Sequence, residues 1–442
     1  MPTVAFHTLG CKVNQSETAA MAHLFRQAGY SVVDFSDIAD VYIVNTCAVT
    51  VQAERKSRQM MRRAREHNPQ ALTVMVGCYP QVAAKAQLTS LPDVDLIVGS
   101  NDKHRIVDLV ADAKQAGQPV VAVSAWGEDA EFSHIAAGQD TQRTRATLKA
   151  QDGCRQFCAY CIIPYARGPE RSRPPASVLE EARMRISEGF QEIVLTGIHL
   201  GSYGRDLQPQ MDLADLVGQL LGLPGLGRLR LSSIEPNDIT AKLLQLISQH
   251  KSFCRHLHIP LQAGDDQVLK AMQRRYSTDE YRQVVSLVRS FLPQAAITTD
   301  VIVGFPGESE EQFSNTCDFV QEIGFSRLHV FRYSRRPGTV AATLPNQIPA
   351  AEKERRSRTL IGIGEMLAAN YAKRLLGKTV EVLWEHEQDG VWTGHTDTYV
   401  QVTARSKQQL QNRITPARAL HVKGGGVVAE LLQEDEQSAR IG

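Results

Sequence analysis

Three cysteines stand close together in the sequence, as Cys154-x3-Cys158-x2-Cys161. Three thiolates from one short loop can hold three corners of a [4Fe–4S] cube and leave the fourth iron without a protein ligand. S-adenosylmethionine (SAM) could then bind the open iron, where one-electron cleavage gives a 5′-deoxyadenosyl radical. The alternatives are a zinc site or unrelated core cysteines, but structural zinc takes four ligands and no fourth cysteine or histidine follows nearby. The spacing therefore predicts a SAM-cleaving cluster.

A second set, Cys11, Cys47 and Cys78, is spread along the chain. Each cysteine lies at or just after the C-terminal end of a predicted parallel strand, and ligand sites in open α/β sheets collect at that edge. The other interpretation is that each is a buried core residue, and spacing alone leaves both open. If the three thiols converge, a second cluster could hold sulfur. Cys254 and Cys317 have no partner at ligand spacing and are predicted to be core residues.

The first region, residues 1–125, alternates short apolar runs with helical stretches. Thr3–Thr8, Val41–Thr46 and Leu72–Gly77 are β-branched and bounded by turn or cap signals, which is typical of buried strands. Ser16 is the expected N-cap of a helix that ends at Gly29. This alternation predicts an open parallel sheet covered on both faces. Residues 126–142 are polar and predicted to be a linker.

The second region, residues 143–376, repeats the strand–helix alternation more strictly. The predicted strands are Ala146–Ala150, Glu192–Thr196, Arg228–Ser232, His256–Pro260, Ile297–Val303 and Arg327–Phe331. Helices are expected between them, for example over Ser177–Gly189, Asp238–His250 and Glu308–Ile323. Six such units predict a partial (β/α)6 barrel whose active site faces the C-terminal ends of the strands. The first cysteine set follows the first of these strands.

The third region, residues 377–442, loses the helical period. Val380–Glu385, Val391–His395, Thr398–Ala404 and Val427–Leu432 are rich in β-formers, and three glycines, 424–426, interrupt the chain before the last of them. This pattern predicts a small antiparallel β-barrel.

Bulk properties narrow the function. The chain has 442 residues, a net charge of +1 and eight cysteines, so RNA contacts must come from local basic patches. No secretory signal and no membrane-spanning run of about 20 apolar residues is visible, so a cytoplasmic protein without membrane contact is expected. Thiols stay reduced in that compartment, which favours metal ligands over disulfides.

The cysteines lie within motifs that resemble those of the radical-SAM methylthiotransferases over essentially the whole chain. The motifs are Thr8-Leu9-Gly10-Cys11-Lys12-Val13-Asn14-Gln15, Asn45-Thr46-Cys47-Ala48-Val49, Gly77-Cys78-Tyr79, Cys158–Gly168, Ser232–Pro236, His258–Gln262, Val303–Glu308 and Tyr333-Ser334-Arg335. The Lys12–Gln15 variant, followed by Thr18, is similar to the branch that modifies N6-threonylcarbamoyladenosine (the MtaB type).

The resemblance implies that Cys11, Cys47 and Cys78 ligate an auxiliary [4Fe–4S] cluster, and that residues 377–442 are a tRNA-binding TRAM domain. It implies two SAM molecules per turnover, one methylating a sulfur on the auxiliary cluster and one providing the radical that activates C2 of the adenine. The expected substrate is N6-threonylcarbamoyladenosine at position 37, in the tRNA anticodon loop. An electron donor such as flavodoxin is expected, and the sulfur donor is not indicated.

Alternative functions stay open at this stage. Within the family they are methylthiolation of N6-isopentenyladenosine in tRNA, or of a ribosomal-protein aspartate. A different class is a non-catalytic iron–sulfur protein that binds RNA or carries electrons. The three-cysteine spacing argues against that class, because electron carriers prefer four protein ligands.

Five residues near strand ends are predicted to contact SAM or substrate: Tyr160, Gly197, Glu235, Gln262 and Gly304. Gly197 stands where SAM-radical enzymes often carry a Gly-Gly-Glu turn, but this chain lacks the acid there. Polar residues at this end of a barrel favour function. Ordinary tight turns explain Gly197 and Gly304 nearly as well.

Two sets of basic residues are candidates for RNA phosphates. Arg55, Arg58, Arg62 and Arg65 form one helical stripe, with Lys56 and Arg63 alongside. The alternative is a solvated helix face paired with carboxylates. Arg167, Arg171 and Arg173 border the first cysteine set and are the favoured candidates. The C-terminal segment is not basic, so its RNA role rests on the resemblance.

Overall fold

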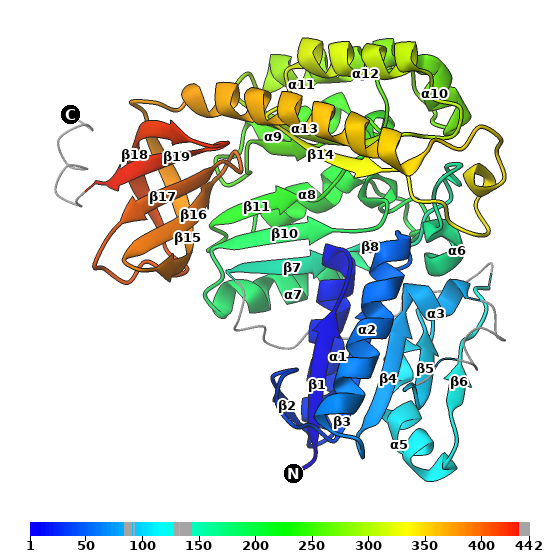
Figure 1. The fold of residues 1–442 in the computed structure, drawn as a ribbon. Coiled ribbons are helices and arrows are strands. Elements are labelled where there is room, and N and C mark those ends of the chain that lie inside the picture. The colour runs from blue at the N-terminus through cyan, green and yellow to red at the C-terminus, as the bar shows by residue number, and fades with distance from the viewer. Residues whose placement is uncertain (84–90, 92, 128–131, 133–143, 433–442) are drawn as a thin grey trace.

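A computed structural model describes residues 1–83, 91, 93–127, 132 and 144–432. The chain builds a parallel-sheet unit, a partial β/α barrel and a small β-barrel, in that order (Figure 1). The predicted fold class is confirmed. Most of the predicted linker, residues 126–142, lies outside the described residues. No described helix is both long enough and apolar enough to cross a lipid bilayer.

The N-terminal unit is a six-stranded parallel sheet in the order β2-β1-β3-β4-β5-β6. Its strands are β1 (Thr3–Thr8), β2 (Ser31–Val33), β3 (Val41–Thr46), β4 (Leu72–Gly77), β5 (Leu96–Gly99) and β6 (Val120–Ala122). Its helices are α1 (Lys12–Gln27), α2 (Val51–His67), α3 (Cys78–Val82), α5 (Ile106–Ala116) and the short η1 (Lys103–Arg105). Strands β1, β3 and β4 have the predicted bounds.

Helix α1 begins earlier than predicted. Its N-cap is Cys11 rather than Ser16, and no side chain of Cys11 caps it. Gly10 adopts a φ of 103°, which turns the chain straight from β1 into the helix. The Asn14 amide then donates to the carbonyl oxygens of Leu9 and Thr46, at 2.8 Å and 2.9 Å. This side-chain bridge, which no local capping rule describes, fixes the start of α1.

The central unit contains six parallel strands in two groups, β11-β10-β7 and β12-β13-β14, joined by isolated bridges from Leu229 to Phe253 and from Ser233 to His258. The strands are β7 (Arg145–Lys149), β10 (Glu192–Thr196), β11 (Arg228–Leu231), β12 (His256–His258), β13 (Ala296–Val303) and β14 (Arg327–Arg332). A two-stranded ribbon, β8 (Gln151–Asp152) and β9 (Arg171–Ser172), brackets the cysteine loop.

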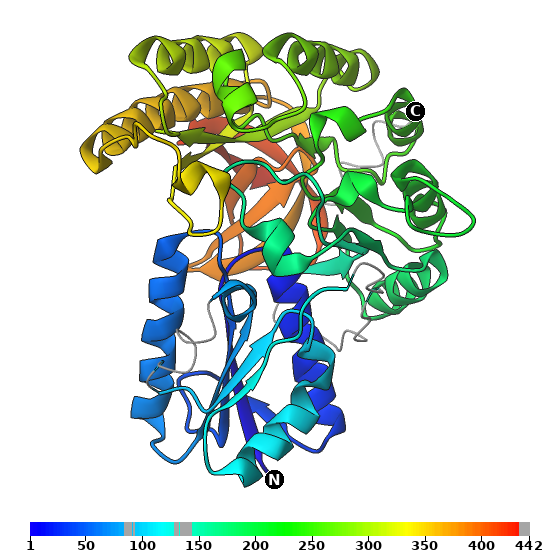
Figure 2. The same cartoon turned by 90° about the vertical axis from the view of Figure 1, so that its right-hand side faces the viewer.

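Helices cover the outside of this open barrel (Figures 1 and 2). They are α6 (Ile163–Arg167), α7 (Pro175–Ser187), α8 (Leu213–Leu221), α9 (Ala241–Ser248), α10 (Asp266–Ala271), α11 (Thr278–Phe291), α12 (Glu310–Ile323) and α13 (Ala350–Lys373), with short turns η2 (Leu200–Ser202), η3 (Pro236–Asp238) and η4 (Val340–Ala342). The sequence analysis missed α13, which lies along β14 and leads into the C-terminal unit.

The C-terminal unit is a closed barrel in the order β15-β16-β17-β19-β18. Its strands are β15 (Thr379–Gln388), β16 (Val391–Thr396), β17 (Gln401–Arg405), β18 (Ile414–Lys423) and β19 (Gly426–Leu431). All pairs are antiparallel except β17–β19, and β18 was not predicted. The fully buried Trp384 and the nearby Trp392 belong to its core.

An ion-pair network joins this barrel to the central unit. Arg145 Nε lies 2.8 Å from Glu192 and its Nη2 lies 3.0 Å from Glu385 of β15, while Arg230 Nε lies 2.6 Å from Glu192. Burial alone would raise the pKa of Glu192, but Arg230 and Arg145 lower that pKa to about 2. Burial also opposes ionisation of Glu385, and hydrogen bonds from His395 and Arg145 bring its pKa to about 2.

This network predicts acid sensitivity of the interface. A carboxyl group with a depressed folded pKa stabilises the fold above its unfolded pKa, about 4.5, and loses that contribution as pH falls towards about 2. Acid titration followed by tryptophan fluorescence should therefore show a transition in this window. Glu385→Gln should weaken the pH dependence, and an unchanged titration in that variant would contradict the prediction.

Candidate iron–sulfur and SAM site

The cysteine loop follows β7 and β8 at the C-terminal edge of the central strands. Gly153 has a φ of 77°, and a Cβ there would stand 1.8 Å from the Pro169 carbonyl oxygen, so only glycine fits. The Cys154 amide donates to the Gly168 carbonyl at 3.1 Å, and the Cys161 amide donates to the Cys158 carbonyl at 2.9 Å. These contacts fold Cys154, Cys158 and Cys161 into one compact loop.

The thiols of this loop are surrounded by protein. Burial raises the pKa of Cys161 to about 12. Burial also raises the pKa of Cys158, an effect that Arg274, whose Nη1 lies 3.2 Å from the Cys158 sulfur, partly offsets. A metal centre must therefore displace protons from these thiols when it binds. Three converging soft sulfur ligands fit an iron–sulfur cluster.

His199 lies beside this loop, a contact the sequence analysis did not predict. The side chains of Cys154, Glu170 and His199 place their ligand atoms within 4.8 Å of one another. His199 Nδ1 lies 2.7 Å from Glu170, and its Nε2 lies 2.7 Å from Asp238. Burial disfavours the imidazolium, but hydrogen bonds to Asp238, Cys154 and Glu170 outweigh it and raise the pKa of His199 to about 12.

The state of this histidine bears on the zinc alternative. An imidazolium carries a proton on both nitrogens and has no lone pair for a metal. Because both nitrogens are occupied by carboxylates, His199 supplies no fourth ligand. The arrangement favours the three-cysteine cluster over a four-ligand zinc site.

The predicted SAM-contacting residues follow the C-terminal ends of successive strands. Arg274 brings two of them to the loop: it forms an ion pair with Glu235 and acts electrostatically on Tyr160. Arg274 follows α10, and no local motif marked it. This cation therefore connects Cys158, Tyr160 and Glu235.

The other three stand where backbone passes close to neighbouring atoms. At Gly197 a Cβ would lie 2.9 Å from Gln151, so the strand end has no room for a side chain. Gln262 has a φ of 67° and bridges to Val301. The Gly304 amide donates to Glu308 at 2.6 Å, which explains this turn without a ligand. No described contact links Gly304 or Gln262 to the cysteine loop.

The second cysteine set converges. Cys11, Cys47 and Cys78 follow β1, β3 and β4, which are neighbours in the sheet. A Cβ on Gly10 would lie 2.8 Å from the Cβ of Cys47 and 3.1 Å from its sulfur, so glycine lets two of the loops approach. Burial raises the pKa of Cys47 to about 12, with contributions from Cys78 and Cys11. The three thiols thus share one edge.

The two cysteine sets face each other. Helix α6 follows Cys161 and packs against α3, which begins at Cys78. Cys78 shares one apolar cluster with Ile162 and Ala166. A single cavity region between the N-terminal and central units can therefore present both cysteine sets to one substrate.

Arg167 fills the space between these units. It is only 1% exposed and reaches from α6 to Glu17 and Asn14 of α1, and its Nη1 lies 3.2 Å from Asp152. Lys103 and Lys149 also pair with Glu17. Despite burial, the surrounding cations hold the pKa of Glu17 well below its usual value. This network fixes the orientation of the two units.

The favoured RNA contacts were wrong. Arg167, Arg171 and Arg173 are all buried, and Arg173 pairs with Glu181. Their charges are used inside the protein because β9 and α6 turn back into the domain interface. Sequence spacing gives no direction to such side chains.

The α2 stripe divides in two. Arg58 donates to the Tyr79 hydroxyl at 3.2 Å, and Arg65 pairs with Asp95 at 2.7 Å. Four cations stay exposed and free to meet phosphates: Arg55, Lys56, Arg62 and Arg63. Cys254 and Cys317 are buried, as predicted.

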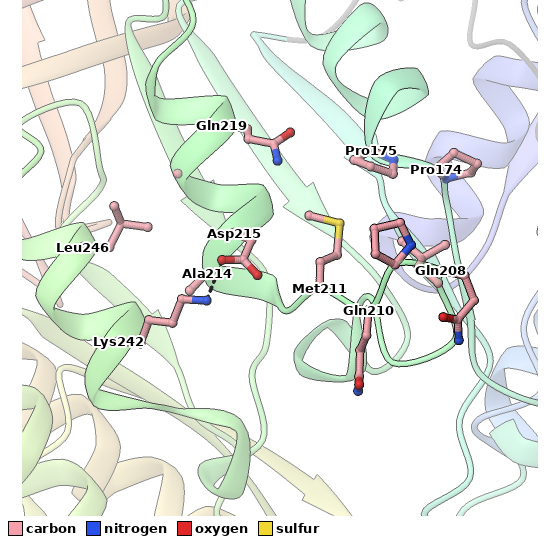
Figure 3. Close-up of a pocket in the computed structure, with 13 residues that line it drawn as sticks. Pro174, Pro175, Gln208, Gln210, Met211, Ala214, Asp215, Gln219, Lys242 and Leu246 are labelled. Carbon is pink, nitrogen blue, oxygen red and sulfur yellow. Dashed lines mark hydrogen bonds and ion pairs between the residues drawn. The ribbon is translucent and has the colours of Figure 1, made fainter.

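A groove of about 940 Å³ lies on the helical side of the barrel (Figure 3). Residues of α8 and α9 line it, together with the loop Leu207–Met211 and Pro174 and Pro175. Lys242 pairs with Asp215 at its wall. No cysteine borders this groove, so it is separate from the cluster site.

Comparisons with known proteins agree with this division. Residues 3–99, which hold the second cysteine set, match "Uncharacterized protein family UPF0004", and residues 148–320, which hold the first, match "Radical SAM superfamily". The chain is similar to "Threonylcarbamoyladenosine tRNA methylthiotransferase MtaB" of Bacillus subtilis, with 40% identity over 95% of this chain and 94% of that protein. The MtaB protein of Thermotoga maritima is 37% identical, over 96% and 95%.

A second type of relative is similar at slightly lower identity. The "tRNA-2-methylthio-N(6)-dimethylallyladenosine synthase" of Pelotomaculum thermopropionicum is 35% identical over 86% of both chains. Among solved structures, the radical S-adenosylmethionine methyltransferase TsrM from Kitasatospora setae has a TM-score of 0.57 and 15% identity, covering 77% of this chain and 75% of that chain. That likeness concerns the fold.

Proposed function

Because the chain belongs to the radical SAM methylthiotransferase family, we propose that it adds a methylthio group to C2 of N6-threonylcarbamoyladenosine at tRNA position 37. Membership of the radical SAM superfamily implies a [4Fe–4S] cluster and SAM. The observation that carries the proposal is the placement of two cysteine triplets across one domain interface. A single cluster would explain radical formation but not a place for the transferred sulfur.

The residues have distinct tasks in this proposal. Cys154, Cys158 and Cys161 would hold the cluster that, with SAM bound, supplies radical chemistry. Cys11, Cys47 and Cys78 would hold an auxiliary cluster. Arg274 orients the first loop through Cys158 and Glu235, and the doubly paired His199 holds the side of that loop next to Cys154.

The remaining partners complete the proposal. The exposed cations of α2 and the C-terminal barrel would contact the tRNA, and the protein would act in the cytoplasm with an electron donor such as flavodoxin. A specific alternative is the isopentenyl-type nucleoside, because synthases of the dimethylallyl type are 33–35% identical to this chain.

Mass spectrometry of digested RNA tests the function. Reconstituted protein with SAM, reductant and tRNA carrying N6-threonylcarbamoyladenosine should yield its 2-methylthio derivative. tRNA carrying N6-isopentenyladenosine serves as the matched substrate and should stay unmodified. Product from only the isopentenyl RNA, or from neither RNA while SAM is cleaved, would reject the proposed substrate.

A further inference from the structure

The interior of the partial barrel carries polar side chains that the cysteine sites do not use. Side chains alternate between the two faces of a strand. On β12, Leu257 packs into the helix-side core, so His256 and His258 face the interior. By the same alternation Thr298 of β13 and His329 of β14 face it too.

These side chains form one wall. Thr298 Oγ1 lies 2.9 Å from both His256 Nε2 and His258 Nδ1, and His258 Nε2 lies 3.2 Å from Asp300. The rings of His258 and His329 have centroids 5.6 Å apart. His256 is only 5% exposed, yet its Nδ1 has no hydrogen-bond partner in the described part of the chain. The wall therefore keeps an unused polar atom.

Lys12 enters this interior from the N-terminal unit. It directly follows Cys11 as the first residue of α1, a helix that packs against β7. Burial lowers the pKa of Lys12 and its charge acts on His256 and His329, yet its surface is solvent-exposed. A side chain that extends into a wide, open cavity has both properties.

The ammonium group of Lys12 is uncompensated. At the floor of the interior, Arg145 and Arg230 share Glu192. Tyr399 of the C-terminal barrel lies against both arginines, with its ring centroid 5.6 Å and 4.6 Å from their guanidinium carbons. Lys12, by contrast, has no ion pair with any residue that the structure describes. An unpaired ammonium beside neutral imidazoles is suited to an anionic ligand.

We propose that Lys12 binds the carboxylate of the threonylcarbamoyl group of the substrate nucleoside, against the wall of His256, His258 and His329. This inference rests on the proposed function. C2 and N6 lie on the same edge of adenine, so a base whose C2 faces the cysteine sites directs its N6 substituent into the interior beside Cys11. That substituent has one carboxylate, whereas an isopentenyl group has no charge to pair with Lys12.

A binding experiment with holoprotein tests the assignment without turnover. Two anticodon stem-loop RNAs would be compared by fluorescence anisotropy, one with N6-threonylcarbamoyladenosine and one with its neutral carboxamide. The wild type should bind the acid about tenfold more tightly, the value expected for a charge-assisted hydrogen bond. Lys12→Gln should abolish this ratio while keeping its affinity for the carboxamide RNA, and Lys12→Arg should restore it.

Lys56→Gln is the matched control, because it removes an exposed cation of α2 outside the interior. It should weaken both RNAs equally and preserve the ratio. Iron content should be the same in all variants. An acid-to-amide ratio near one in the wild type, or a ratio unchanged in Lys12→Gln, overturns the assignment. Formation of 2-methylthio product by the wild type is measured separately, so failure of the proposed function is distinguishable from failure of the Lys12 assignment.

Discussion

Replacing Cys11 by alanine is expected to lower the iron content of the reconstituted protein from about eight to about four atoms per chain, since each thiolate set should hold one cube. The variant should still cleave SAM to 5′-deoxyadenosine, because the loop of Cys154, Cys158 and Cys161 is built from separate contacts. It should form no methylthio product. Iron and sulfide analysis, together with chromatography of the nucleoside products, measures all three effects.

The complementary variant separates the two sites. Cys158→Ala should also lose about four irons, but it should lose 5′-deoxyadenosine formation as well. Cys317→Ala is the matched control, because Cys317 is a core residue of α12 far from both sets in the fold and should retain about eight irons. Eight irons in Cys11→Ala, or loss of SAM cleavage in that folded variant, would contradict separate clusters.

The strand ends that position the second cysteine set could be predicted from local sequence. Val41–Thr46 and Leu72–Gly77 are continuous apolar, β-branched runs, and strands buried on both faces have this composition. Once the sheet is parallel, its topology places the residues after these runs at one edge. The order β1-β3-β4, which makes Cys11, Cys47 and Cys78 neighbours, depends on long-range pairing and needed the structure.

The environment of the first set was less accessible to sequence reasoning. His199 and Arg274 are distant in sequence from the cysteine loop, and each reaches it because a different barrel strand or helix ends there. Helix α13 was missed because its pattern is weakly amphipathic, with charged residues on most of its surface. Charge spacing also could not reveal that an arginine turns inward, since burial is decided when two units dock.

Arg167 shows what that docking contributes to stability. Removing one member of a buried ion pair leaves its partner charged and desolvated, at a typical cost of 3–5 kcal/mol. Because Lys103 and Lys149 still contact Glu17, Arg167→Met is expected to destabilise the protein by about 3 kcal/mol, the lower end of that range. The variant should unfold at lower denaturant concentration.

The position of Arg167 predicts a second effect that general destabilisation would not produce. Arg173 is also buried and pairs with Glu181, but this pair lies within the central unit, so Arg173→Met is the matched control. Both variants should lose stability, but only Arg167→Met should raise the amount of 5′-deoxyadenosine formed per methylthio product, because only Arg167 connects the two cysteine sets. Equal ratios in the two variants would show that Arg167 stabilises the interface without aligning the two sites.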